Sequence, residues 1–300
     1  MDARDDQNKH DSGEPRPYRG RFAPSPTGPL HFGSLLAATG SFLQARSNGG
    51  AWLVRIEDID PPREVQGAAK NQLETLARFG MVPDEPVVYQ SSSSALHNAA
   101  LGHLRARALA FDCACSRRDL PSSGIYPGTC RSGIPPDKTA RSVRFRVPGP
   151  PVELIDRVFG QLSYPLREIC GDFVIRRADG LFAYQLAVAV DDIAAGATEI
   201  VRGSDLLESS PRQQVLFEAL DAPVPRWMHL PLVVDKSGRK ISKSTGADPV
   251  QQARPARTLA VALEALGHRP PPGLRSLESL WTWAITQWSP ERIPVDPFEI

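Results

Sequence analysis

The chain has 300 residues, of which 41% are hydrophobic and 23% charged, and its formal net charge at pH 7 is +1. This length suffices for one large or two modest domains, and the composition is that of a globular protein. The near-neutral charge excludes bulk attraction to nucleic acid, so RNA binding would depend on local basic patches. Because no apolar run reaches the length of a membrane span, no membrane partner is expected.

The N-terminal segment, residues 1–18, is predicted to be a disordered tail. It is polar and charged as far as Pro17 and lacks the apolar stretch of a signal peptide. The four cysteines do not resemble a disulfide framework, since two of them are one residue apart. Together these features predict a cytoplasmic protein, and we expect a monomer.

The segment Arg21–Ser34 reads RFAPSPTGPLHFGS and precedes an apolar helical run, Leu35–Leu43. A loop that enters a helix in this way presents free backbone N–H groups, and the helix dipole favours a phosphate there. His31 can donate to phosphate oxygens, and Gly28 and Gly33 allow close approach of the backbone. The segment therefore predicts a phosphate site.

Strands and helices alternate after this segment, in the order strand 51–56, helix 63–79, strand 87–90 and helix 95–110. Such alternation predicts a parallel α/β sheet. Residues 111–152 break the rhythm and are rich in Pro, Gly, Ser and Arg, so we predict that they belong to an insertion. The pattern resumes with a strand at 199–201 and a helix at 211–220.

The predicted insertion holds Cys113, Cys115 and Cys130. On their spacing alone, a zinc site and three unliganded thiols are equally consistent with the sequence. His97 and His103, on the preceding predicted helix, are candidates for a fourth ligand. Cys170 is distant in sequence and is interpreted as a small buried apolar residue.

Basic residues also gather in the predicted insertion: Arg117, Arg118, Arg131, Arg141, Arg144 and Arg146. They are equally consistent with an RNA path and with a solvated loop that pairs in part with Asp119, Asp137 and Glu153.

A second informative segment, Lys240–Ser244, reads KISKS. Alone, it is typical of an exposed loop. Together with the Arg21–Ser34 segment it predicts a site that closes on a nucleoside triphosphate, in which Lys240 and Lys243 hold the leaving pyrophosphate. Two helices, 250–267 and 274–287, are predicted after it, separated by a run of prolines.

The two segments together resemble the HIGH and KMSKS signatures of class I aminoacyl-tRNA synthetases. The residues Arg21–Gly28 with His31–Ser34 are similar to the glutamyl branch, as are Val54–Asp60, Asp191–Asp192 and Val201–Leu207. Ser34 replaces the second histidine of HIGH, which leaves His31 as the only imidazole there. The resemblance covers about Arg21 to Ser244 and implies an α/β, Rossmann-type class I catalytic domain.

Fewer than sixty residues follow Ser244, too few for the helical anticodon-binding region of a full glutamyl-tRNA synthetase. The sequence therefore most resembles a family of truncated paralogues, the glutamyl-Q tRNA(Asp) synthetases. This resemblance implies activation of L-glutamate by ATP and Mg²⁺ to glutamyl-adenylate, and transfer of glutamate to the queuosine base in the anticodon of tRNA(Asp).

Three alternatives remain at this point. A truncated synthetase would charge a tRNA 3′ end. Another nucleotidyl transferase would use a small acid with one carboxylate, which the pair Arg21 and Arg202 disfavours. An inactive paralogue would only bind RNA or a partner, which the intact ATP segments disfavour.

The resemblance also implies site residues. The glutamate pocket comprises Arg21, Phe22, Ala23, Pro24, Ser25, Glu57, Tyr184 and Arg202. In it the arginines would meet a carboxylate, Glu57 the ammonium group, and Tyr184 would form a wall. Without the resemblance, Tyr184 would read as a core aromatic and Glu57 as a surface carboxylate or helix cap.

The implied ATP site comprises Thr27, Gly28, His31, Gly33, Ser34 and Lys243, with His31, Lys240 and Lys243 as the catalytic residues. One structural Zn²⁺ per chain would be held by Cys113, Cys115, Tyr126 and Cys130. The expected domains after the tail are a first catalytic half (19–110), an insertion with the zinc site and an acceptor-binding region (111–190), a second catalytic half with the KMSKS loop (191–245), and a short helical C-terminal region (246–300).

Overall fold

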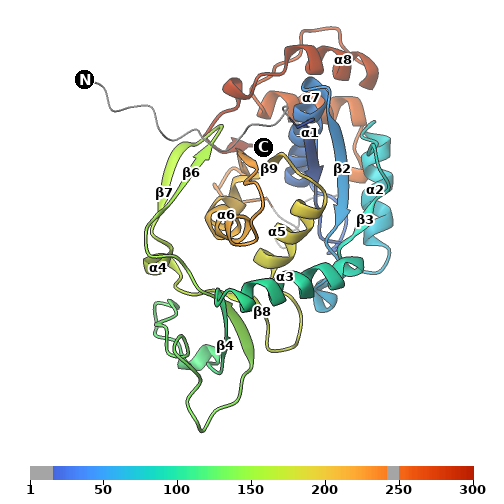
Figure 1. Cartoon of the computed structure of the whole chain (residues 1–300). Helices are drawn as coiled ribbons and strands as arrows, with labels where there is room; N and C mark the ends of the chain where they lie inside the picture. Colours follow the sequence, from blue (N-terminus) through green and yellow to red (C-terminus); the bar gives the residue numbers. More distant parts are fainter. Residues whose placement is uncertain (1–15, 242–249) are drawn as a thin grey trace, which may run out of the picture.

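The computed structural model describes residues 16–241 and 250–300, and parallel strands form the centre of this part of the chain (Figure 1). In the first half, β1 (Arg19–Phe22) pairs with β2 (Ala51–Ile56), which pairs with β3 (Val88–Tyr89). In the second half, β9 (Glu199–Gly203) pairs with β10 (Arg226–Leu230), which pairs with the end of β6 (Val152–Asp156). The predicted parallel α/β sheet is therefore confirmed.

The two halves meet where β1 lies beside β9. The amide of Thr198 donates to the carbonyl of Arg19 at 2.9 Å, and the amide of Arg19 donates to Thr198 Oγ1 at 2.9 Å. The strands thus follow the order β3-β2-β1-β9-β10-β6. The strand order reverses between β1 and β9, and in open α/β sheets such a switch point is where ligands bind.

Each half has its own apolar core. The first forms around α1 (Phe32–Ser47), where Leu35 and Leu43 are fully buried with Trp52 of β2. The second forms around α5 (Tyr184–Ala194) and α6 (Ser210–Ala219), with Leu186, Leu216 and Trp227 at its centre. Most of the buried residues of both helices are apolar, and burial of such a face is what stabilises a helix.

The break in the α/β rhythm corresponds to antiparallel structure. Strands β4 (Ala110–Cys113), β5 (Ser142–Phe145) and β8 (Val174–Arg176) form one antiparallel sheet. The β6 strand forms a hairpin with β7 (Gly160–Tyr164), followed by the short helix α4 (Leu166–Ile169). These elements lie apart from β1–β3 in Figure 1, although β6 returns to the central sheet at Asp156.

The C-terminal helices complete the first core. Both α7 (Pro255–Ala265) and α8 (Leu277–Gln287) pack on α1, and Trp281 Nε1 donates to the carbonyl of Phe79 at 2.8 Å. Two short strands, β11 (Val233–Val234) and β12 (Phe298–Glu299), pair in parallel beside them. The 3₁₀ turns are η1 (Pro61–Arg63), η2 (Gln90–Ser93), η3 (Arg117–Asp119), η4 (Ser204–Ser209), η6 (Val250–Gln252) and η7 (Pro290–Arg292).

Several predicted boundaries are wrong, and local chemistry explains them. The predicted helix 63–79 begins only with α2 (Ala68–Arg78), because the prolines of η1 form a separate turn and Gly67 has φ 79°. The helix 95–110 is α3 (Ser94–Ala106), and its last predicted residue starts β4. The helix 250–267 is interrupted before Pro255, which occupies the first helical turn of α7.

The expected domains stay predictions, and two observations lie at their limits. Tyr18, at the end of the predicted tail, is buried in the first core, whereas residues 1–15 lie outside the described part. The limit at residue 191 falls inside α5. Among the described helices, none combines the length and the apolar character that crossing a membrane demands.

Candidate active site

Three charged side chains approach one edge of the central sheet. Arg21 is near the end of β1, Arg202 near the end of β9, and Glu57 directly follows β2. The carboxyl ends of parallel strands face the same edge, which is the ligand edge of such sheets. All three residues are at least nine-tenths buried. Charged groups at this depth need a partner or a ligand, so this edge is the candidate active site.

Arg21 is paired with a carboxylate of the protein itself. Its Nε and Nη2 atoms donate to the two oxygens of Asp192, both at 3.0 Å, and Arg55 Nη1 donates to the same carboxylate at 2.6 Å. Burial alone would raise the pKa of Asp192, but the charges of Arg21 and Arg55 outweigh it and hold the pKa below its usual value. Asp192 thus occupies the Nε and Nη2 donors of Arg21, and no hydrogen bond from Nη1 is found among the described side chains.

The network extends to two further carboxylates. Arg55 Nη2 donates to Glu57 at 3.1 Å, and burial raises the pKa of Glu57. Asp191 accepts from Gln90 at 2.7 Å and lies 2.8 Å from His97 Nε2. These buried partners fix the side chains of the sheet edge in place.

Arg202 differs from Arg21 because its partners are neutral. Its Nε donates to His229 Nε2 at 3.2 Å, and its Nη2 donates to Ser210 Oγ at 2.6 Å and more weakly to a backbone carbonyl. Its Nη1 is buried and has no hydrogen-bond partner among the described residues. No ion pair joins Arg202 to a carboxylate in residues 16–241 or 250–300. Burial lowers the pKa of Arg202, and the more distant charges of Asp192 and Glu57 offset this effect only in part.

Tyr184 and Phe22 have different surroundings. Tyr184 is the first residue of α5 and is 36% exposed, so its ring is a surface beside the sheet edge rather than a core aromatic. Phe22 is buried and stacks on Trp52 with ring centroids 6.5 Å apart, so its side chain belongs to the core. Ala23, Pro24 and Ser25 lie in the loop that leaves β1, where the carbonyl of Pro24 accepts from the amide of Glu57 at 3.0 Å.

The phosphate segment forms the N-terminus of α1. His31 is the N-cap residue, and its Nδ1 accepts from the amide of Ser34 at 3.4 Å. The neutral ring therefore carries its proton on Nε2, the donor that a phosphate oxygen needs. Gln72 holds the loop by donating to the carbonyls of Ser25 and Gly28, at 3.0 and 2.7 Å. Gly28 has φ 132°, a conformation that favours glycine.

The second segment begins beside the first. A Cβ atom on Gly33 would lie 3.1 Å from the His31 ring and 3.8 Å from the carbonyl of Ile241. The described chain resumes at Val250, whose amide donates to the carbonyl of Leu30 at 3.0 Å. Lys240 Nζ donates to Asp205 at 2.6 Å. Lys243 lies outside the described residues, but both flanks of its segment adjoin the phosphate loop.

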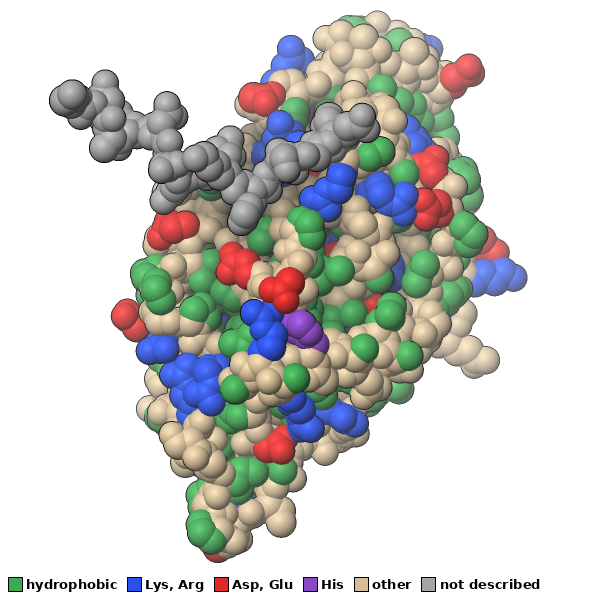
Figure 2. All heavy atoms as spheres, in the orientation of Figure 1, with side chains coloured by type: hydrophobic (Ala, Val, Ile, Leu, Met, Phe, Trp, Pro, Cys, Tyr) green, Lys and Arg blue, Asp and Glu red, His purple; other side chains and the backbone are tan. Residues whose placement is uncertain are grey.

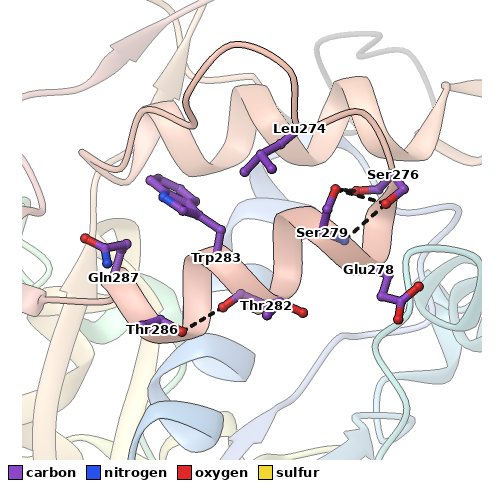
Figure 3. Close-up of a pocket in the computed structure, with 8 residues that line it drawn as sticks. All are labelled: Leu274, Ser276, Glu278, Ser279, Thr282, Trp283, Thr286 and Gln287. Carbon is purple, nitrogen blue, oxygen red and sulfur yellow. Dashed lines mark hydrogen bonds between the residues drawn. The ribbon is translucent and has the colours of Figure 1, made fainter.

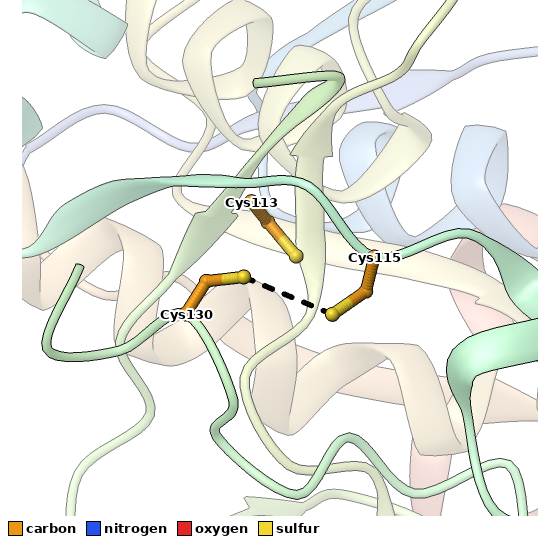
Figure 4. A group of neighbouring side chains, drawn as sticks. All are labelled: Cys113, Cys115 and Cys130. Atoms are coloured by element: carbon orange, nitrogen blue, oxygen red, sulfur yellow. Dashed lines mark hydrogen bonds between the residues drawn. The ribbon is translucent and has the colours of Figure 1, made fainter. Parts of the chain in front are cut away.

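The thiols of Cys113, Cys115 and Cys130 form a compact cluster, with all three sulfur atoms within 4.8 Å of one another (Figure 4). Tetrahedral zinc with Zn–S bonds of about 2.3 Å places two sulfurs about 3.8 Å apart, and a sulfur and an oxygen about 3.5 Å apart. Cys115 and Cys130 are separated by 3.7 Å, and Cys113 Sγ lies 3.6 Å from the Tyr126 hydroxyl. Both separations fit a tetrahedral Cys₃Tyr site.

Arg144 supports this cluster. Its Nε donates to Cys113 at 3.2 Å, and its guanidinium lies 3.9 Å from the centre of the Tyr126 ring. Burial disfavours the Cys113 thiolate, but hydrogen bonds from Tyr126 and Arg144 outweigh it, so the pKa of Cys113 is lowered. Burial and the neighbouring thiols raise the pKa of Cys115 to about 11.

The two histidines proposed as rival ligands lie elsewhere. His97 is buried against Asp191 and packs on Phe182, and His103 is 3.4 Å from Asp221. Neither belongs to the cysteine cluster. Tyr126 is therefore the better-placed candidate for the fourth ligand.

The basic residues of the insertion have two kinds of environment. Arg131, Arg144 and Arg146 donate to backbone carbonyls and so hold the fold together. Arg117, Arg118 and Arg141 are exposed. On the face shown in Figure 2, basic and acidic side chains are interspersed, as the near-neutral net charge predicts.

A groove of about 540 Å³ runs along α8 (Figure 3). It is lined by hydroxyl and apolar side chains with Glu278 as its charged group, and it shares no residue with the candidate site. Because it presents no cation, it is not suited to ATP or to a dicarboxylate.

Several residues of the site were missed by sequence reasoning. The partners Asp192, Arg55, His229 and Asp156 were not assigned roles. The sequence signals were the acidic pair Asp191–Asp192 and an arginine inside the apolar run of β2, both unusual in buried elements.

Comparisons with known proteins agree with this arrangement. The family described as tRNA synthetases class I (E and Q), catalytic domain, matches residues 18–123 and 132–255. A glutamate tRNA ligase from Elizabethkingia meningosepticum, solved in complex with its amino acid, superposes with a TM-score of 0.81 at 24% identity, covering 95% of this chain and 67% of that one. It shows the fold.

Curated relatives are closer in sequence. The glutamyl-Q tRNA(Asp) synthetase of Chromobacterium violaceum is 48% identical over 94% of this chain and 97% of its own length. That of Aromatoleum aromaticum is 50% identical over 93% of this chain and 91% of its own length. The chain therefore belongs to the class I tRNA synthetases of the E and Q branch and, within that branch, to the family of the glutamyl-Q tRNA(Asp) synthetases.

Proposed function

We propose that this protein activates L-glutamate with ATP and transfers the glutamyl group to the queuosine base of tRNA(Asp). The observation that carries the proposal is the buried guanidinium of Arg202 at the switch point of the sheet, which no carboxylate of the described residues pairs with and whose Nη1 lacks a hydrogen-bond partner there. A buried cation without a counter-ion is costly, and a bound carboxylate would remove that cost. The names of the relatives supply the acceptor.

In the first step, a carboxylate oxygen of glutamate attacks the α-phosphorus of ATP, and the bond to the leaving pyrophosphate breaks. Arg202 Nη1 and the remaining donor of Arg21 would bind the side-chain carboxylate. Glu57 would accept from the ammonium group, and Tyr184 would form the exposed wall. The protein forms no covalent bond in this step and acts by orientation and charge.

The phosphates would lie at the N-terminus of α1, against the backbone of Gly28 and Gly33, with Thr27 and Ser34 beside them. His31 would donate through Nε2. Lys240 and Lys243 would hold the pyrophosphate, and Mg²⁺ bound with ATP would help to neutralise the charge of the phosphates. In the second step, a nucleophile of the acceptor base attacks the activated carbonyl carbon, loses its proton and releases AMP.

Lys243→Ala is expected to slow pyrophosphate exchange by about a hundredfold or more, with little change in the KM for glutamate. The reason is that its charge would be used on the departing pyrophosphate, not on the amino acid. Lys236→Ala removes an exposed lysine from the turn before the segment and is the matched control. Equal exchange rates in both variants would remove Lys243 from the active site.

Three further parts of the proposal concern cofactor and partners. One Zn²⁺ would be held by Cys113, Cys115, Cys130 and Tyr126, whose spacing fits the metal. The exposed arginines Arg117, Arg118 and Arg141 would face the RNA. We further propose that the protein acts as a monomer in the cytoplasm, where its tRNA substrate is found.

Transfer of labelled glutamate to tRNA(Asp) tests the acceptor. Labelling is expected with tRNA that carries queuosine, to persist after the 3′ ribose is oxidised, and to be absent from tRNA that lacks the modified base. An ester that needs an intact 3′ end would instead indicate a truncated glutamyl-tRNA synthetase. Absence of pyrophosphate exchange with glutamate, with or without tRNA, would indicate an inactive RNA-binding paralogue.

A further inference from the structure

The two arginines of the site are held in opposite ways. Arg21 is paired directly with the Asp192 carboxylate, which it shares with Arg55. Arg202 is held by the uncharged acceptors His229 and Ser210, which fix its position but leave its charge intact. A carboxylate in place of His229 would compete with any anionic ligand for Arg202. The choice of a neutral acceptor therefore has a functional consequence.

His229 can act as that acceptor only in one tautomer. An arginine Nε always donates, so His229 Nε2 must accept, and the ring proton must sit on Nδ1. Asp156 fixes this arrangement, because its Oδ2 lies 2.6 Å from His229 Nδ1 and 3.1 Å from the backbone amide of His229. Both side chains are fully buried. Burial also lowers the pKa of His229, in keeping with a neutral ring.

Ser210 completes the support. Its hydroxyl accepts from Arg202 Nη2 at 2.6 Å and lies 2.9 Å from His229 Nε2. The Arg202 guanidinium also lies 5.3 Å from the centre of the Trp227 ring. With Nε and Nη2 both committed, Nη1 is the one donor nitrogen left for a ligand among the described contacts.

We propose that His229, fixed by Asp156 and assisted by Ser210, is a positioning residue that holds Arg202 for the substrate carboxylate without pairing it with a carboxylate of the protein. This inference rests on the proposed function, since it assigns Arg202 to glutamate. It also means that a residue of β6, in the segment with the antiparallel hairpin, helps to set the affinity of the pocket through β10 and β9.

The test compares two substitutions at His229 in pyrophosphate exchange by the full-length protein. Asparagine places its amide where Nδ1 lies, so His229→Asn keeps a partner for Asp156 but loses the acceptor for Arg202. Glutamine reaches the position of Nε2, so His229→Gln keeps an acceptor for Arg202. We expect His229→Asn to raise the KM for glutamate by about tenfold or more, with the KM for ATP unchanged, and His229→Gln to remain within about threefold of the native value.

Melting temperatures of both variants control for misfolding. Should His229→Asn fail to fold, Ser210→Ala carries the test, with a smaller rise in the KM for glutamate and no change for ATP. A folded His229→Asn or Ser210→Ala variant with a native KM for glutamate, or with both KM values raised together, would overturn the positioning role and leave the proposed function intact. Absence of exchange in the native protein would overturn both.

Discussion

Arg202→Ala is expected to lower kcat/KM for glutamate in pyrophosphate exchange by a factor between about thirty and several thousand. Loss of one buried charged contact costs on the order of 2–5 kcal/mol, and each 1.4 kcal/mol or so is a factor of ten. The effect should exceed that of an exposed arginine because Arg202 is buried and forms no ion pair with a carboxylate of the described residues.

Pyrophosphate exchange with glutamine in place of glutamate is the second measurement of this experiment. The native protein should prefer glutamate, because an amide cannot replace a carboxylate on a buried guanidinium. If Arg202 meets the side-chain carboxylate, Arg202→Ala should erase much of this preference. If the variant loses glutamate and glutamine activity in equal proportion, Arg202 does not meet the side chain, and the two-arginine pocket is wrong. Arg202→Lys keeps the positive charge but loses the planar guanidinium. Its kcat/KM for glutamate should therefore lie between that of the native protein and that of Arg202→Ala.

Cys113→Ser is expected to abolish zinc binding and to lower the melting temperature by about 10 °C or more. Structural zinc contributes folding free energy directly, and several kcal/mol corresponds to a shift of this size in a chain of this length. Cys113 is fully buried in a small apolar cluster of the insertion with Ala114, Tyr126 and Cys130, so loss of the metal would leave this cluster without its main cross-link. Metal analysis and thermal unfolding measure the two effects.

Cys170→Ser is the matched control. The Cys170 thiol interacts with the carbonyls of Leu166 and Gly171 and is not part of the cluster, so metal content should be unchanged. Tyr126→Phe should retain zinc but release it faster to a chelator. A stable native protein that contains no zinc after purification without added metal would favour three unliganded thiols.

The sequence predicted the local backbone structure around the candidate site better than the side-chain contacts within it. The turn and helix start at Arg21–Leu35 are local signals, as is the apolar run of β2, and they correspond closely to the structure. The pairs Arg21–Asp192 and Arg55–Asp192 join residues more than a hundred positions apart, and no spacing rule connects them. The sequence therefore identified the arginines but not which of them the protein itself neutralises.

The predicted start of the second helix is also wrong. The sequence predicts that this helix begins at Arg63, whereas Arg63 ends the η1 turn and the left-handed Gly67 delays the start of α2 until Ala68. Apolar periodicity indicates which face of a helix is buried, but it does not indicate at which residue the helix begins. Roles of the site residues and of the expected domains stay predictions.

The packing of α7 and α8 on α1 makes these C-terminal helices part of the structure that supports the candidate active site. Besides the Trp281 contact, Trp288 Nε1 donates to Gln44 of α1 at 2.6 Å, and Leu259 and Leu263 are fully buried against the same helix. The helix that presents His31 at one end is thus clamped along its length by the last part of the described chain. A fragment that ended soon after the second signature motif would lack α7 and α8. The α1 helix, which carries His31 of the first motif, would then lose the two helices that pack on it.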